Sequence, residues 1–181
     1  MATSHTILEG NIIYLRHIKL SDVNENYLSW LNDSQVMKGI LSSGYNLEKL
    51  KSYVTEKINS THTHFFAIIT KSNNLHIGNI KLDFHDSKSN LSEMGVLIGD
   101  KDYWGKGIAK EACSLVLDYG FKKLNLRKIF LAVFENNIHA IKLYKSLGFK
   151  TEGKLIKHIS VDGVLYDKYL MGVFSKDYLK K

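Results

Sequence analysis

The chain has 181 residues, of which 44% are hydrophobic and 24% are charged, and these values fit one soluble globular domain over residues 1–181. The formal net charge of +7 comes from lysines spread along the sequence, without a cluster of basic and aromatic residues, so we expect no nucleic-acid partner. No stretch approaches the ~18 apolar residues of a membrane span, and the first ten residues lack the apolar core of a signal peptide, so we expect no membrane partner. The single cysteine excludes an internal disulfide and fits the reducing cytoplasm, where we place the protein.

The spacing of apolar residues predicts the helices and strands in chain order. A strand is expected at 11–18, then a helix capped by Ser21 that runs to Asn32, and a second helix at 47–59 capped by Asn46. The remaining elements are strands at 65–70, 76–84 and 90–99, a helix of about four turns from Ile108, a strand at 129–134, a helix at 138–147 ended by Gly148, and a hairpin of 155–160 and 164–173. The fold class is therefore α/β (α+β), with a mixed, mostly antiparallel central sheet flanked by helices.

A glycine-rich turn joins one of these strands to a helix. The strand Glu93–Gly99 leads to Trp104-Gly-Lys-Gly-Ile-Ala109, and the amphipathic helix begins directly there. Glycines at 105 and 107 let a ligand approach the backbone closely, and free N–H groups at a helix start favour a phosphate. Lys106 adds a positive charge nearby.

This turn alone leaves alternatives open. A tight strand-to-helix turn without a ligand has the same glycines. The turn lacks the third glycine of the dinucleotide fingerprint and the Gly-Lys-Ser/Thr of a P-loop, so any phosphate site here is of another kind.

A second segment, Asn137-x-x-Ala140-x-x-x-Tyr144-x-x-x-Gly148-Phe149, follows downstream. Together with the turn at 104–109, it resembles the GNAT superfamily of acyl-CoA N-acyltransferases, and the strand order extends this resemblance over essentially the whole chain. The chain looks most similar to the RimJ/RimL-like branch. It departs from the common pattern at Trp104, where many members carry Arg or Gln.

The resemblance implies a fold, a cosubstrate and an activity. Acetyl-CoA would lie in a splay between two parallel strands, Glu93–Gly99 and Lys128–Phe134, and would donate its acetyl group to an amine. The acceptor would be a protein N-terminus or a small amine such as a nucleotide-linked amino sugar or a polyamine, and a homodimer is left open. The implied cofactor-binding residues are Val96, Leu97, Ile98, Trp104, Gly105, Lys106, Gly107, Ile108, Ala109, Asn137, Ala140, Tyr144 and Lys145.

Two residues are predicted to be catalytic. Tyr144 is the candidate general acid, because a phenol can protonate a thiolate of similar basicity, and the resemblance implies the same role. A core tyrosine on a buried helix face is the alternative. Glu93 is the candidate base for the acceptor ammonium, and a solvent-facing strand glutamate or a water chain is the alternative. A backbone N–H around Leu97–Ile98 would bind the oxyanion.

Other candidates are weaker. Cys113 lies within an amphipathic helix and is expected to pack in the core, and His62 with His64 has no third residue at metal-ligand spacing, so we expect no metal. Lys142 and Lys145 would reach the 3′-phosphate of CoA. The acceptor pocket is expected at the Met37–Tyr45 loop, the strand near His85 and the hairpin around Tyr166. A silent acyl-CoA sensor is the alternative function.

Overall fold

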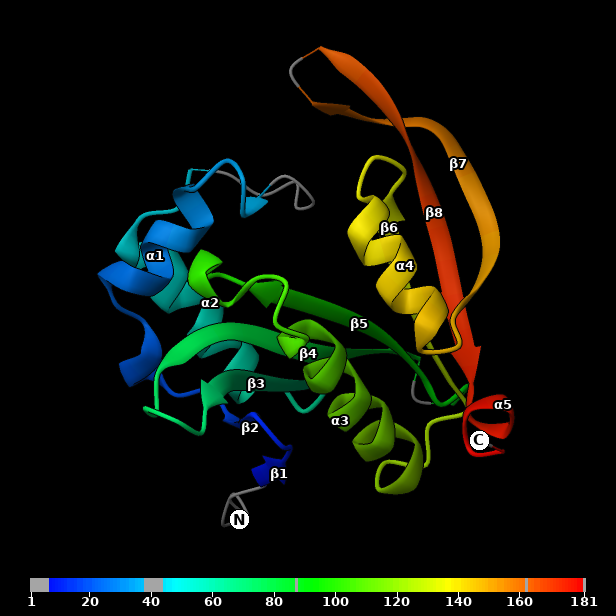
Figure 1. The fold of residues 1–181 in the computed structure, drawn as a ribbon, viewed down its shortest axis with the longest axis horizontal. Helices are drawn as coiled ribbons and strands as arrows, with labels where there is room; N and C mark the ends of the chain where they lie inside the picture. Colours follow the sequence, from blue (N-terminus) through cyan, green and yellow to red (C-terminus); the bar gives the residue numbers. More distant parts are fainter. Residues whose placement is uncertain (1–6, 38–43, 87, 162, 181) are drawn as a thin grey trace.

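The computed structural model describes residues 7–37, 44–86, 88–161 and 163–180 (Figure 1). The strands are β1 (Ile7–Glu9), β2 (Ile13–His17), β3 (Thr63–Thr70), β4 (His76–Asp86), β5 (Leu91–Ile98), β6 (Lys128–Phe134), β7 (Lys150–Val161) and β8 (Val164–Phe174). The helices are α1 (Glu25–Asn32), α2 (Leu47–Asn59), α3 (Ile108–Lys122), α4 (Ile138–Ser146) and α5 (Ser175–Tyr178), with short 3₁₀ turns at Leu20–Asp22 and Lys101–Tyr103. Within the described ranges, no helix combines the length and the apolar character that crossing a bilayer requires.

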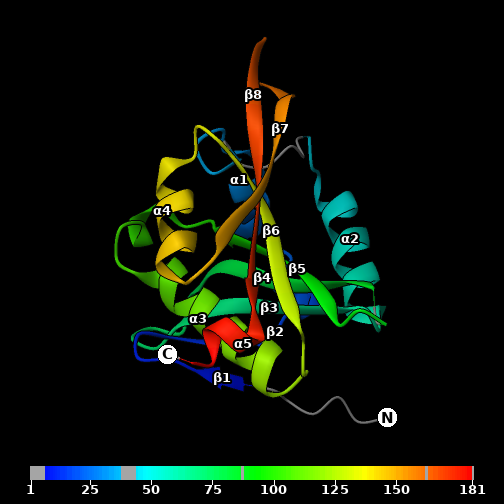
Figure 2. The same ribbon diagram turned by 90° about the vertical axis from the view of Figure 1, so that its right-hand side faces the viewer.

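One sheet in the order β1-β2-β3-β4-β5-β6-β8-β7 forms the centre of the molecule. All neighbouring strands run antiparallel except β5 and β6, which are parallel. The mixed, mostly antiparallel sheet with flanking helices is thus confirmed. Figure 2 shows α3 and α4 on one side of the sheet and α2 on the other, while the β7–β8 hairpin extends beyond the body.

Each face of the sheet has its own hydrophobic core. On one face α3 and α4 cover a large cluster that includes Phe66, Leu82 and Val116. On the other face α1 and α2 cover a smaller cluster that includes Trp30 and Leu50. Residues 65–70 of β3 are therefore all buried, because the strand has a covering layer on both sides.

The two parallel strands part soon after they meet. β5 and β6 pair only at Leu91–Glu93 and Lys128–Phe130, although β5 continues to Ile98 and β6 to Phe134. Beyond Glu93, β5 keeps β4 as its neighbour and β6 keeps β8. The predicted splay is present, and its fork lies at Glu93 and Phe130.

Some boundaries differ from the prediction. The first helix begins at Glu25, and its N-cap is Asn24, whose side chain accepts a hydrogen bond from the Tyr27 N–H at 3.0 Å, so the prediction of Ser21 as the cap was wrong. Residues 20–22 form a 3₁₀ turn instead, held by Asp22. β1 was not predicted because three residues give no periodicity. β7 begins five residues earlier than predicted, since its polar first half is an edge strand. The Asn46 cap of α2 is confirmed.

Candidate active site

The glycine turn presents a row of backbone donors at the start of α3. Gly105 and Gly107 have φ angles of 73° and 80°, in the left-handed region that favours glycine, and Gly107 is the N-cap of α3. Among the described residues, the N–H groups from Gly105 to Lys110 have no backbone acceptor, and the first such bond of the helix runs from Glu111 N to Gly107 O at 3.1 Å. The turn can therefore bind an anion with backbone donors and the positive end of the helix dipole.

The open edge of β5 offers further backbone groups. Gly99 N donates to Ile77 O at 2.9 Å, and the regular register pairs Leu97 with Asn79, so the polar groups of Leu97 point to β4. The alternating groups of Val96 and Ile98 point away from β4, into the gap that separates β5 from β6. An extended ligand in this gap could pair with them as an added strand.

The side chain of Trp104 ties the turn to this edge. Its Nε1–H donates to the Ile98 carbonyl at 2.9 Å, although the side chain is 44% exposed. The indole thereby holds the end of β5 against the start of the phosphate turn. Lys106 Nζ lies 5.3 Å from the centre of the Tyr103 ring, close to the same turn.

The start of α4 contributes two asparagines. Asn137 is the N-cap, and its Oδ1 accepts from the Ala140 N–H at 3.2 Å, while its Nδ2 can donate to a ligand. Asn136 was not predicted as a site residue. Its Oδ1 is buried and, within the described part of the chain, meets no donor. A buried acceptor without a donor is costly, and a ligand N–H would relieve that cost.

Tyr144 lies on the buried side of α4. It is 8% exposed, and its ring packs 5.7 Å from the Phe149 ring. Burial, with a smaller contribution from Cys113 of α3, raises the pKa of the Tyr144 hydroxyl well above its usual range. The group is therefore a proton donor at every physiological pH.

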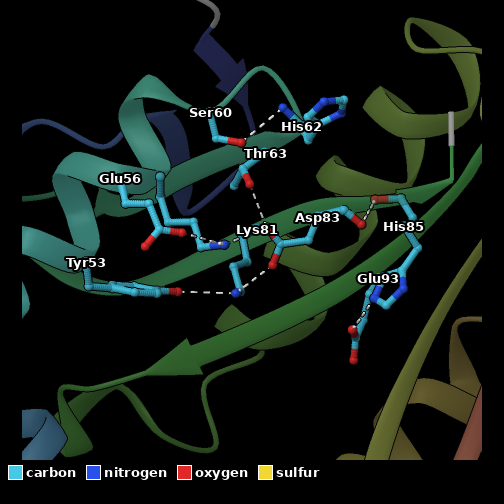
Figure 3. A network of polar contacts seen from close by, with 11 residues as sticks. Tyr53, Glu56, Ser60, His62, Thr63, Lys81, Asp83, His85 and Glu93 are labelled. Atoms are coloured by element: carbon cyan, nitrogen blue, oxygen red, sulfur yellow. Dashed lines mark hydrogen bonds and ion pairs between the residues drawn. The ribbon is translucent and has the colours of Figure 1, made fainter.

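Glu93 lies on the opposite face of the sheet, at the fork. Its Oε2 is 3.0 Å from Nε2 of His85 (Figure 3). The centre of the His85 ring lies 5.1 Å from that of Phe130. Glu93 and His85 line a hollow of about 380 Å³ beside α2, within the size range of small-ligand sites. The other lining residues are Lys57, Ser60, His62, Thr63, Asp83 and Phe84.

A polar network continues from this hollow along β4. Lys81 Nζ contacts Asp83 at 2.6 Å and the Tyr53 hydroxyl at 3.2 Å, and Thr63 Oγ1 donates to Asp83 at 2.7 Å (Figure 3). Lys81 and Asp83 are two residues apart on β4, and Glu93 of β5 pairs directly with Asp83. All three side chains therefore point to the α2 face of the sheet. Sequence spacing could not reveal this network, which depends on the β4–β5 register.

Cys113, His62 and His64, the other residues singled out in the sequence, lie in different parts of the fold. Cys113 is fully buried, as predicted, and burial raises the pKa of its thiol to about 12, so it is inert. His64 Nδ1 lies 3.2 Å from the Tyr119 hydroxyl on the α3 side, while His62 lines the hollow on the α2 side, so the structure does not bring the two histidines together. No cluster of three or more metal-ligating side chains occurs in the described ranges.

The predicted acceptor pocket is only partly described. Residues 38–43 of the Met37–Tyr45 loop lie outside the described residues. His85 lines the hollow as predicted, whereas Tyr166 is not among its lining residues. Lys142 and Lys145 are exposed on α4.

The sequence and the overall fold have counterparts among known proteins. The family model described as "Acetyltransferase (GNAT) domain" matches residues 13–150, and the chain belongs to this family of acyltransferases. The N-acetyltransferase p20 of Bacillus licheniformis is 36% identical over 62% of this chain and 63% of that protein. The probable N-acetyltransferase YjcK of Bacillus subtilis is 27% identical over 94% of this chain and 98% of that protein. The crystal structure of spermidine N-acetyltransferase from Vibrio cholerae in complex with CoA and spermine superposes with a TM-score of 0.85 and 26% identity, covering 92% of this chain and 98% of that one.

Proposed function

We propose that the protein transfers an acetyl group from acetyl-CoA directly to a primary amine while both substrates are bound. One observation carries the proposal: the splay opens between the turn before α3, with its row of free backbone donors, and the Glu93–His85 pair, which lies at the fork in a hollow on the α2 side. Two substrates can therefore reach the same point from opposite faces of the sheet. Proximity of this kind is a large part of catalysis.

Acetyl-CoA fits the α3 side. The pyrophosphate would lie on the N–H groups of Gly105, Lys106, Gly107, Ile108 and Ala109, and Lys145 would approach the 3′-phosphate. The pantetheine arm would pair with Val96 and Ile98 in the gap, with Nδ2 of Asn137 and Oδ1 of Asn136 as further partners. Leu97 and Ala140 would shape the gap, since the polar groups of both are already engaged.

The chemistry follows from the residues at the fork. The Glu93–His85 pair would accept the proton of the acceptor ammonium, which frees the amine to attack the thioester carbonyl. The N–H groups on the open side of β5, those of Val96 and Ile98, would stabilise the oxyanion. Tyr144 would then give its proton to the leaving thiolate.

The acceptor and the setting are part of the same proposal. The similarity to the spermidine N-acetyltransferase of Vibrio cholerae supports a small amine such as a polyamine, and the motifs support a RimJ/RimL-like member. A protein N-terminus and a nucleotide-linked amino sugar remain candidate acceptors of the acetyl group. We place the enzyme in the cytoplasm, where acetyl-CoA is made, and a homodimer is compatible with the proposal.

The test is release of free thiol from acetyl-CoA in the presence of a panel of amines. We expect release that depends on the amine and that falls much further in Glu93→Gln than in Glu48→Gln, an exposed glutamate in the first turn of α2 outside the hollow lining. Tight acetyl-CoA binding without release from any amine would support a silent acyl-CoA sensor instead.

A further inference from the structure

The charges around the hollow are nearly all balanced within the protein. The Asp83 carboxylate lies 2.6 Å from Lys81 Nζ, 2.7 Å from Thr63 Oγ1 and 3.5 Å from Lys57 Nζ. Burial alone would raise the pKa of Asp83, but the hydrogen bonds from Lys81 and Thr63 and the nearby lysine charges lower it. Asp83 is therefore ionised and already neutralised, and it offers no charge to an incoming cation.

Glu93 is then the one carboxylate of the hollow lining that faces no lysine in the described structure, and it pairs with His85. The stretch 38–43, which the structure does not describe, contains Lys38 and no acidic residue. A polyamine needs a carboxylate for each of its ammonium groups once they leave water. This hollow supplies one, which suits a single amino group.

Lys57 also pairs with carboxylates, but its hydrogen-bond donors remain open to a ligand. Its side chain is 20% exposed and lines the hollow, and its Nζ lies 3.5 Å from Asp83 and 4.0 Å from Glu56. It forms ion pairs but no hydrogen bond with the described residues. Since an ammonium group has three donors, Lys57 can donate to an anionic ligand group within reach of Glu93.

We infer that the acceptor is an amine that also carries an anionic group, a carboxylate or a phosphate, with its ammonium at Glu93 and its anion at Lys57. The inference rests on the proposed function and narrows its acceptor. Asp83 fixes the separation of the two ends, because it lies across from Glu93 in the β4–β5 register and also contacts Lys57. The acceptor is thus a small zwitterion or amino phosphate rather than a polycation.

The experiment measures kcat/KM for thiol release with amines of matched length. The carboxylate series is 5-aminovalerate, pentylamine and 1,5-diaminopentane; the phosphate series is phosphoethanolamine and ethanolamine; spermidine is the polycation. We expect the anionic amine of at least one series to exceed its uncharged counterpart by roughly ten- to hundredfold, the worth of a charge-assisted hydrogen bond. The two series distinguish a carboxylate from a phosphate as the recognised group.

Two variants of Lys57 test whether this residue recognises the anionic group of the acceptor. Lys57→Met should abolish the preference for the anionic amine, and Lys57→Glu should shift preference toward 1,5-diaminopentane. Lys51→Met, an exposed lysine on the same helix outside the hollow lining, should leave the preference unchanged. Thermal midpoints of all three variants would show whether Lys57 also holds α2 in place.

The outcomes separate the two proposals. Transfer that favours spermidine or the diamine in the unaltered protein would overturn this inference and leave the proposed function standing. An anionic preference that survives Lys57→Met would also overturn it. Absence of transfer to every amine, with acetyl-CoA bound, would overturn both.

Discussion

The phenol of Tyr144 lies beside Cys113 and Phe149 in the core under α4, where little water reaches the ring. Charging a phenol in such surroundings is unfavourable, so the hydroxyl keeps its proton far above neutral pH. A free thiolate is less basic than this phenolate, so the proton would move to sulfur as the C–S bond breaks, while negative charge builds on a leaving group that the same poorly hydrated surroundings do not stabilise. The surroundings of Tyr144 thus fit a proton donor better than a base.

We expect Tyr144→Phe to lower kcat by roughly 10²–10⁴-fold, the usual contribution of general acid–base catalysis, and to change acetyl-CoA affinity little. Because the folded pKa is raised, the protonated hydroxyl persists through pH 10, and kcat should show no loss assignable to Tyr144 up to that pH. Steady-state rates with the unaltered protein and variant from pH 6 to 10, together with direct binding of CoA, test this. An unchanged kcat would remove Tyr144 from the mechanism.

The ion pair of Arg16 and Asp22 contributes to the stability of the fold. The Arg16 guanidinium donates two hydrogen bonds, of 2.6 and 2.8 Å, to the buried Asp22 carboxylate, and the Lys19 N–H donates a third at 2.7 Å. Burial alone would raise the pKa of Asp22, but these hydrogen bonds bring it below its usual range. The pair joins β2 to the turn that precedes α1.

We expect Arg16→Met to destabilise the protein by roughly 2 kcal/mol at pH 7, because a buried carboxylate loses its charged donors. Since the folded pKa of Asp22 is depressed, its stabilisation is full above the unfolded pKa of about 3.9 and is lost as the pH falls through the lower folded value. Urea unfolding at pH 7 and near pH 3 measures this. A variant deficit of equal size at both pH values would contradict the linkage to Asp22.

At the scale of elements, the turn before α3 combines a structural requirement with the binding role that we propose for it. Gly107 takes a left-handed conformation as the N-cap, and a side chain there would meet open space. The cost of replacing it is therefore conformational rather than steric. Gly163 in the β7–β8 turn has a similar φ of 78° and equally open surroundings.

We expect Gly107→Ala and Gly163→Ala each to cost about 1–2 kcal/mol of stability, the penalty for a left-handed L-residue. Only Gly107→Ala should also weaken acetyl-CoA binding, because it shifts the N–H donors of the turn. Thermal unfolding and calorimetric titration with CoA, run on both variants, separate the two effects. Equal loss of affinity in both would show that the turn has no special role.

At the scale of the molecule, the splay divides the sheet into two parts. Strands β1–β5 form one part and β6, β8 and β7 the other, and three residues of each strand join them where β5 meets β6. A CoA molecule in the gap would add contacts to both parts. Binding to the folded state alone stabilises a protein by mass action.

We expect CoA at 100 times its Kd to stabilise the protein by about 2.7 kcal/mol, which corresponds to a rise in Tm of roughly 5–10 °C at this size. A thermal scan over a series of CoA concentrations measures this. Adenosine 3′,5′-bisphosphate, which lacks the pantetheine arm, serves as the comparison and should give a smaller rise at equal concentration. Equal rises would place no part of the ligand in the gap.

The amino-acid sequence by itself determined most of the elements and the glycine turn before α3, because both depend on local features. Apolar spacing within ten to fifteen residues fixed α2, α3 and α4, and the two glycines with a following helix marked the turn. It did not determine β1 or the first half of β7, whose residues pair at sheet edges without a clear pattern. The Ser21 cap failed because Asp22 makes the local turn and Asn24 lies one residue before the helix.

Only the tertiary structure decided what surrounds Glu93. The pairing of His85 with Glu93, the neutralised Asp83 and the unfilled donors of Lys57 all depend on the β4–β5 register and on where α2 lies over the sheet. A shift of one residue in that register would turn Glu93 to the α3 face. The apolar side chains of Met94, Val96 and Ile98 favour the observed orientation of β5, but only its pairing with β4 places Asp83 opposite Glu93. The buried Oδ1 of Asn136 is of the same kind, since burial arises from segments distant in sequence. Local chemistry therefore marks the turn that we propose for CoA, whereas long-range packing sets the surroundings of the acceptor site that we propose.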